Sequence, residues 1–216
     1  MTFSEIRYFF NNKYLTAKNF LLFLGLVALV VSIILGYIFY SKNYNQKAFE
    51  MFSESVVEYQ KALGSGSSQD FANAEQAFSA SYKAYSKSTV SPFMLSYQAD
   101  AALRSGNQKE AIDLMQKALT AIELSSPVYY LYATKLALMQ LDSHDESVKV
   151  QGKDLLEKLS KIFNNPYKDM ASYYLGYQVW VAGDFDSAKK YWQVLAQAGQ
   201  DSIWAALASS KLALIN

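Results

Sequence analysis

The longest apolar run of the chain extends from Phe20 to Tyr40, and none of its 21 residues is charged. A helix of this length, with a rise of about 1.5 Å per residue, spans roughly 31 Å, which matches the hydrocarbon core of a bilayer. The run is longer than the apolar part of a secretory signal, and bulky residues such as Phe39 leave no small-residue cleavage site at its end. The pattern therefore predicts an uncleaved transmembrane helix over 20–40.

A short tail, 1–19, precedes this run. Its apolar residues Ile6, Phe9, Phe10 and Tyr14 recur at helical spacing. We expect an amphipathic helix that lies on the membrane surface. The alternative is a docking site for a cytoplasmic partner.

The charges that flank the apolar run indicate its orientation. Arg7, Lys13 and Lys18 precede it, whereas Lys42 and Lys47 follow it closely. Since three cations precede the run and two follow it, the positive-inside rule favours a cytoplasmic amino terminus. The prediction is a single-pass membrane protein with its tail in the cytoplasm and its large domain, 41–216, outside the cytoplasm. A repeat domain that faces the cytoplasm is the alternative.

After the apolar run, the spacing of apolar residues stays helical as far as residue 63, and a Gly/Ser loop follows at 64–68. No helix breaker separates this stretch from the run. One long helix is therefore predicted, with a kink near residues 41–45 as the alternative.

Proline positions divide the rest of the chain into repeating units. The chain's three prolines stand in Ser91-Pro92, Ser126-Pro127 and Asn165-Pro166. Each pair predicts an N-cap residue followed by proline at the first helical position, where the missing N–H costs nothing. Each of these first helices is expected to be followed by a turn and a second helix.

The second helices share a pattern of a small residue followed four positions later by a large one. The large positions are Phe78, Met115, Leu155 and Trp192, and the small ones are Ala74, Ala111 and Ala188. The third unit has Gln151 at the small position and is therefore expected to be degenerate.

The turns inside the units carry capping signals. Gly106-Asn107 before Glu110 and Ser143 before Glu146 have capping-box spacing. Gly183-Asp184 offers a C-cap glycine and an N-cap residue. These patterns predict an all-α domain that ends in a capping helix at 201–214.

Composition narrows the class of partner. The chain of 216 residues has a formal charge of +1, and no stretch forms a basic patch, so nucleic acid is not an expected partner. The chain has 17 tyrosines and 13 phenylalanines but no cysteine. This composition favours an all-α domain that is rich in aromatic residues.

These units resemble the tetratricopeptide repeat. The best match is the fourth unit, with Leu175-Gly176 in the first helix, Gly183-Asp184 at the turn, and Ala188 with Trp192 in the second helix. The stretch 105–118 is similar to the second half of the motif. The resemblance implies stacked helix pairs in an α-solenoid.

The overall layout resembles the YfgM-like ancillary subunits of the bacterial Sec translocon. The likeness lies in the basic-aromatic tail 5–13, the single span, the degenerate repeats and the closing run 188–216. This family implies a periplasmic domain that associates with translocon subunits and with membrane-anchored periplasmic chaperones.

Residues for catalysis are scarce in this sequence. His144, in Asp142-Ser-His-Asp-Glu146, is the single histidine. That segment would suit a cation, but a metal site needs more ligands in fixed geometry, and a polar helix cap explains it more simply. No nucleophile elbow or phosphate-binding loop is present. We therefore expect neither an enzyme nor a bound cofactor or metal.

The first helices carry stripes of aromatic residues. Tyr173, Tyr177 and Trp180 are spaced at i, i+4 and i+7. If the repeat alignment holds, such positions line the concave face of the solenoid, and large aromatics suit the capture of a peptide or helix. The candidate partner-binding groove comprises Phe93, Asp100, Tyr132, Leu136, Met139, Tyr173, Tyr177 and Trp180. Ordinary packing between helices is the alternative for each of them.

The leading hypothesis is thus a scaffold, anchored in the inner membrane, that binds translocon subunits, chaperones or client chains and assists protein export or folding in the envelope. The alternative is a coordinator of cell-envelope assembly or division with the same kind of repeat domain.

Overall fold

The computed structural model describes residues 17–197 and 202–215, and every regular element in those ranges is a helix. The predicted all-α class is confirmed. The helices are α2 (Ala17–Ser65), α3 (Ser68–Tyr85), α4 (Ser91–Ser105), α5 (Gln108–Thr120), α6 (Pro127–Leu141), α7 (Glu146–Lys161), α8 (Lys168–Val181), α9 (Phe185–Gln197) and α10 (Ile203–Ile215). The predicted tail, 1–19, lies outside the described residues except for its last three positions.

Helix α2 contains the predicted span. Every residue from Leu21 to Tyr40 is exposed, so nothing in the described part of the chain covers this apolar surface. The helix is long and apolar enough to cross a membrane, as a membrane anchor or a signal sequence would be. Because water solvates such a surface poorly, this part of α2 is a candidate membrane-spanning segment.

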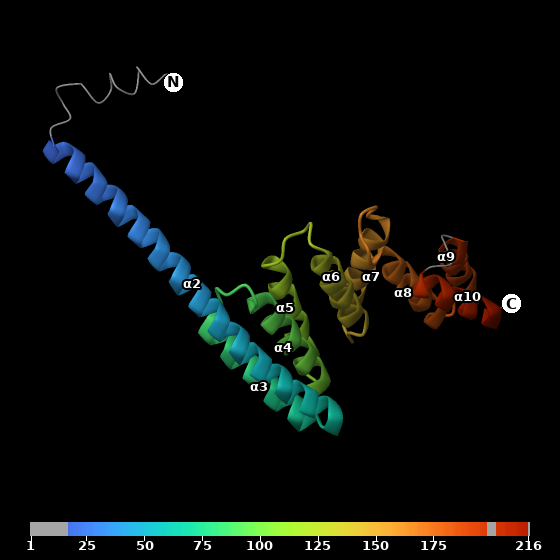
Figure 1. Ribbon diagram of the computed structural model, residues 1–216. Helices are drawn as coiled ribbons and strands as arrows, with labels where there is room; N and C mark the ends of the chain where they lie inside the picture. Colours follow the sequence, from blue (N-terminus) through green and yellow to red (C-terminus); the bar gives the residue numbers. More distant parts are fainter. Residues whose placement is uncertain (1–16, 198–201, 216) are drawn as a thin grey trace, which may run out of the picture. The chain divides into compact units, whose positions relative to one another are not determined.

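The chain divides into two compact units, 1–47 and 48–216. Within the second unit each helix packs against the next one along the chain, and α10 packs on both α8 and α9 (Figure 1). This is a repeat-like array of helix pairs, as the proline spacing predicted. Each pair has too little surface to bury its own apolar face, so neighbouring pairs pack together and their buried residues form successive clusters along the array.

The second helices of all these pairs follow one packing rule. Their fully buried large residues are Phe78, Met115, Leu156 and Trp192, and the residues four positions earlier are Ala74, Ala111, Gly152 and Ala188. The prediction that the third unit is degenerate is therefore wrong, because its alignment was shifted by one residue. Leu156 occupies the place assigned to Leu155, and Gly152 is the small residue that the pattern requires.

Close approach between helices explains two of the glycines. A Cβ atom at Gly152 would lie 2.7 Å from the carbonyl oxygen of Ala137 on α6. A Cβ atom at Gly176 on α8 would lie 2.5 Å from the indole nitrogen of Trp192 on α9. Both helix crossings need the space that a missing side chain leaves.

The predicted starts of the first helices are partly right. Ser126 is the N-cap of α6 with Pro127 at the next position, as expected. In α4 the N-cap is Val90 and Ser91 is already helical, and α8 begins at Lys168, after the Asn165-Pro166 pair. Asn165 instead belongs to the preceding turn, where its buried side chain bonds the backbone.

The predictions of capping residues at the turns are also partly right. Gly106 and Gly183 adopt left-handed conformations, with φ of 100° and 86°, and close α4 and α8 as C-cap glycines do. Asp184 caps α9, because its carboxylate accepts a hydrogen bond from the Ser187 amide at 3.0 Å. Ser143 does not cap α7; Asp145 does, accepting from the Ser147 amide at 2.8 Å.

Candidate protein-binding surface

The predicted groove residues come from the first helices of three successive pairs, α4, α6 and α8. The structure gives them different surroundings. Leu136 and Met139 belong to a core cluster with Ala111 and Met115 of α5. Their burial leaves these two side chains almost no surface for a partner, so they act as packing residues.

An aromatic contact joins the first two of these helices. The rings of Phe93 on α4 and Tyr132 on α6 meet edge to face, with 6.3 Å between centroids. Both residues are half-buried. The Tyr132 phenol is neutral at physiological pH, and burial raises its pKa further above the ordinary value. Half-buried rings of this kind leave apolar area for a partner.

Asp100, also on α4, is surrounded by groups from three helices. Its carboxylate accepts a hydrogen bond from the Tyr59 phenol of α2, and it pairs with Lys135 Nζ of α6 at 2.8 Å and with Arg104 Nε of α4 at 3.8 Å. We call these four residues the Asp100 cluster. The Asp100 side chain is 18% exposed, so its carboxylate is largely shielded from water. The charge of Asp100 is paired with cations of the same domain, so this residue links α4 to α2 and α6.

The candidates on α8 belong to an aromatic cluster. Tyr173 and Trp180 both approach Trp192 of α9, with centroid distances of 6.1 and 6.3 Å. Trp204 of α10 packs 5.5 Å from the Tyr173 ring. We call Tyr173, Tyr177, Trp180, Trp192 and Trp204 the Trp192 cluster.

The terminal helix also places a cation on this cluster. Lys211 Nζ lies 4.5 Å from the Trp180 ring centroid and 5.4 Å from that of Tyr177. Such contacts are attractive because the quadrupole of an aromatic ring gives its face a partial negative charge. Tyr173 is buried, whereas Tyr177 and Trp180 stay half-buried beside Lys211. The α8 stripe is thus partly covered by the chain's own last helix.

Sequence reasoning missed the cations that accompany these candidates. Arg104, Lys135 and Lys211 each contact a predicted groove residue. Arg104 follows Asp100 by one helical turn, a spacing that would have indicated the pair. Lys135 and Lys211 come from other helices, so only the packing of those helices brings them into place.

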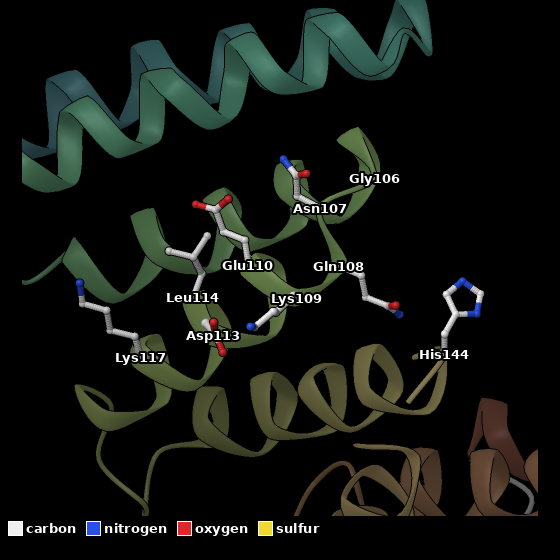
Figure 2. Close-up of a pocket in the computed structure, with 9 residues that line it drawn as sticks. All are labelled: Gly106, Asn107, Gln108, Lys109, Glu110, Asp113, Leu114, Lys117 and His144. Carbon is white, nitrogen blue, oxygen red and sulfur yellow. The ribbon is translucent and has the colours of Figure 1, made fainter. Parts of the chain in front are cut away.

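An open cavity lies beside α5 and the adjoining turns, away from these candidates. It has a volume of about 830 Å3 and is lined by Gly106, Asn107, Gln108, Lys109, Glu110, Asp113, Leu114, Lys117 and His144. Figure 2 shows that most of these side chains are spread along α5, from Gln108 to Lys117, and that His144 comes from the turn before α7. No cluster of metal-ligating residues occurs among the described residues. Gly106-Asn107, Glu110 and His144 stand out in the sequence as turn and capping signals, but they did not predict a cavity between them.

Comparison with known proteins identifies no family for this chain. No family model matches the sequence, and no curated protein matches it. The function must therefore be inferred from the fold and from the arrangement of its side chains.

Proposed function

We propose that this chain is a membrane-anchored scaffold that binds protein partners through the face carried by α4, α6 and α8. The observation that supports it is the set of half-buried aromatic rings on these helices, with cations on the same helices or against the rings. Phe93 and Tyr132 accompany Lys135, and Tyr177 and Trp180 accompany Lys211. Such rings offer a partner a large contact area with few rotatable bonds.

Membrane attachment is the second part of the proposal. The exposed apolar surface of α2 is treated as an uncleaved anchor, with the amino terminus in the cytoplasm and the repeat domain in the periplasm. A reporter enzyme that is active only in the periplasm, fused after Asn216, tests the orientation. Activity supports the proposed topology, and a reporter that works only in the cytoplasm overturns it.

The partner class follows from the tetratricopeptide-like units and the likeness in layout to YfgM-like subunits. We propose that the partners are Sec translocon subunits and membrane-anchored periplasmic chaperones, whose work on exported chains the scaffold assists. The function requires no catalytic group, cofactor or metal. A repeat fold by itself does not determine a partner, so this step depends on the resemblance.

Crosslinking in cells, followed by extraction in mild detergent and mass spectrometry, tests the partner class. Recovery of Sec channel subunits supports the proposal. Recovery of envelope synthases without them supports the alternative, a coordinator of envelope assembly or division.

A pair of variants tests the face itself. Phe93→Ala removes a ring from the face, and Leu124→Ala removes an exposed apolar side chain from the α5–α6 connection as a matched control. We expect the first to reduce crosslinked partner at least severalfold with little change in thermal unfolding, and the second to change neither. Unchanged crosslinking with Phe93→Ala would contradict the proposed face.

A further inference from the structure

The turn between α7 and α8 presents an apolar aromatic side chain to solvent. Phe163 is 87% exposed, and its neighbour Ile162 is also exposed. Val194 on α9 is 70% exposed. It lines the same cavity of about 610 Å3 as Lys168 and Lys190. Lys168 connects this cavity to the turn, since its Nζ lies 5.9 Å from the Phe163 ring centroid. We call Ile162, Phe163, Lys168, Lys190 and Val194 the Phe163 patch.

The shape of the turn is held by a buried residue. The Asn165 side-chain amide donates to the Leu159 carbonyl at 2.8 Å, and its oxygen accepts from the Tyr167 amide at 2.8 Å. The Lys168 amide donates to the Asn165 carbonyl at 3.2 Å. Asn165 is itself almost completely buried, so these bonds are shielded from water. The exposure of Phe163 is therefore set by the fold.

Positive charge accompanies the apolar side chains. Lys168 and Lys190 belong to the patch, and Lys161 directly precedes Ile162. The acidic groups nearby include Asp169, which also lines the cavity, Glu157, which pairs with Lys161 at 3.7 Å, and Asp184, which interacts electrostatically with Lys190. Among these lysines, Lys168 lies against the exposed Phe163 ring, so a cation directly accompanies the apolar surface that faces solvent.

We propose that the Phe163 patch is a second contact of this chain with the membrane, made on an anionic lipid surface. Aromatic and aliphatic side chains at a bilayer interface bury their apolar area among the lipids, while lysines beside them attract anionic headgroups. The proposal rests on membrane attachment through α2, which keeps lipid at high effective concentration, and not on any protein partner. An acidic protein segment could satisfy the same charges, and the experiment distinguishes it.

The absence of cysteine from the chain permits a direct test. Phe163→Cys is labelled with a polarity-sensitive fluorophore, and the full chain is reconstituted into phosphatidylcholine vesicles with or without phosphatidylglycerol. Leu124→Cys is the matched control, because Leu124 is also an exposed apolar residue in a connection but follows Glu123. Vesicle flotation of both labelled chains reports anchoring by α2 independently of the fluorophore.

We expect a blue-shifted emission at position 163 that lipids carrying a quencher reduce, only when phosphatidylglycerol is present. The control label should show neither effect. In the Phe163→Cys chain, the additional change Lys168→Gln should weaken the lipid-dependent signal about fivefold, since each lysine near an anionic surface contributes on the order of 1 kcal/mol.

Two results would overturn the inference. One is equal emission from both labels in floating vesicles that contain phosphatidylglycerol. The other is a shielded label at position 163 that lipid quenchers do not reach, which would indicate a protein contact at the patch. Failure of both chains to float would instead contradict anchoring by α2, and with it the basis of the inference.

Discussion

Asp100 on α4 and Tyr173 on α8 come from equivalent first helices, yet different interactions connect them to their neighbours. We call the region around Asp100 the polar end of the array and the region around Tyr173 its aromatic end. The Asp100 cluster is joined by ion pairs and a hydrogen bond that bring together α2, α4 and α6. The Trp192 cluster is joined by ring contacts among α8, α9 and α10. One repeat geometry thus accepts either a polar or an aromatic link, and the neighbouring helices determine which of the two forms.

A single substitution in the Trp192 cluster should cause the largest loss in the free energy of unfolding. Trp192→Ala removes a fully buried side chain that touches two α8 rings and donates to the Tyr173 carbonyl at 3.1 Å. We expect a loss of about 3–5 kcal/mol in the free energy of unfolding, from the cavity and the lost contacts. Urea unfolding of the full chain in detergent, followed by circular dichroism, measures it. A loss below about 1 kcal/mol would show that the cluster is not a packed core.

Gly176→Ala tests the same cluster by adding a methyl group where α8 and Trp192 approach closely, instead of by removing contacts. The new methyl group would clash with the Trp192 indole, so we expect a loss of about 1–3 kcal/mol. Gly64→Ala in α2 is the matched control, because nothing lies within 4 Å of a Cβ atom there. It should be neutral or stabilise by up to about 1 kcal/mol. Equal effects of the two changes would mean that the close approach does not exist.

Asp100→Asn tests the polar end. The amide keeps an acceptor for Tyr59 but removes the charge that faces Lys135, and we expect a loss of about 1–2 kcal/mol. The loss should be smaller than for Trp192→Ala, because Lys135 is 36% exposed and water replaces part of the lost interaction. Lys135→Met in the Asp100→Asn background should then cost less than in the wild-type chain. Additive losses would show that the two side chains do not interact.

Alkaline pH should weaken the link between Tyr59 and Asp100. Burial, with the hydrogen bond to Asp100 as the next cause, raises the pKa of the Tyr59 phenol above its ordinary value of 10.0. The folded chain therefore keeps this proton where the unfolded chain has lost it, so the phenol's contribution to stability is full below about pH 10 and is lost as the pH rises further. Tyr59→Phe should flatten the decline of the urea midpoint above that pH. An unchanged slope would rule out Tyr59 as its source.

Much of the fold was predictable from spacing alone. The proline pairs indicated three of the first helices, and the small-to-large pattern indicated the second helices. The errors were errors of register. Leu156 replaced Leu155 because Gly152, not Gln151, can approach the α6 backbone, and a pattern of side-chain sizes does not contain that distance.

The candidate surface was less predictable than the fold. A stripe at i, i+4 and i+7 marks one face of a helix, but whether that face is covered depends on helices elsewhere in the chain. Leu136 and Met139 proved to be core residues, and α10 brought Trp204 and Lys211 onto the α8 stripe. The stripe alone could not distinguish a covered aromatic face from an open one.

Two features follow from the order of residues without any tertiary information: an apolar helix long enough for a bilayer, and an all-α chain of helix pairs. Both depend on periodicity and composition within short windows. Tertiary packing was needed to establish which residues share a cluster, where Asp100 finds its cations, and why Phe163 faces solvent. Those outcomes depend on contacts between distant segments, and the free energy of such contacts depends on burial and distance.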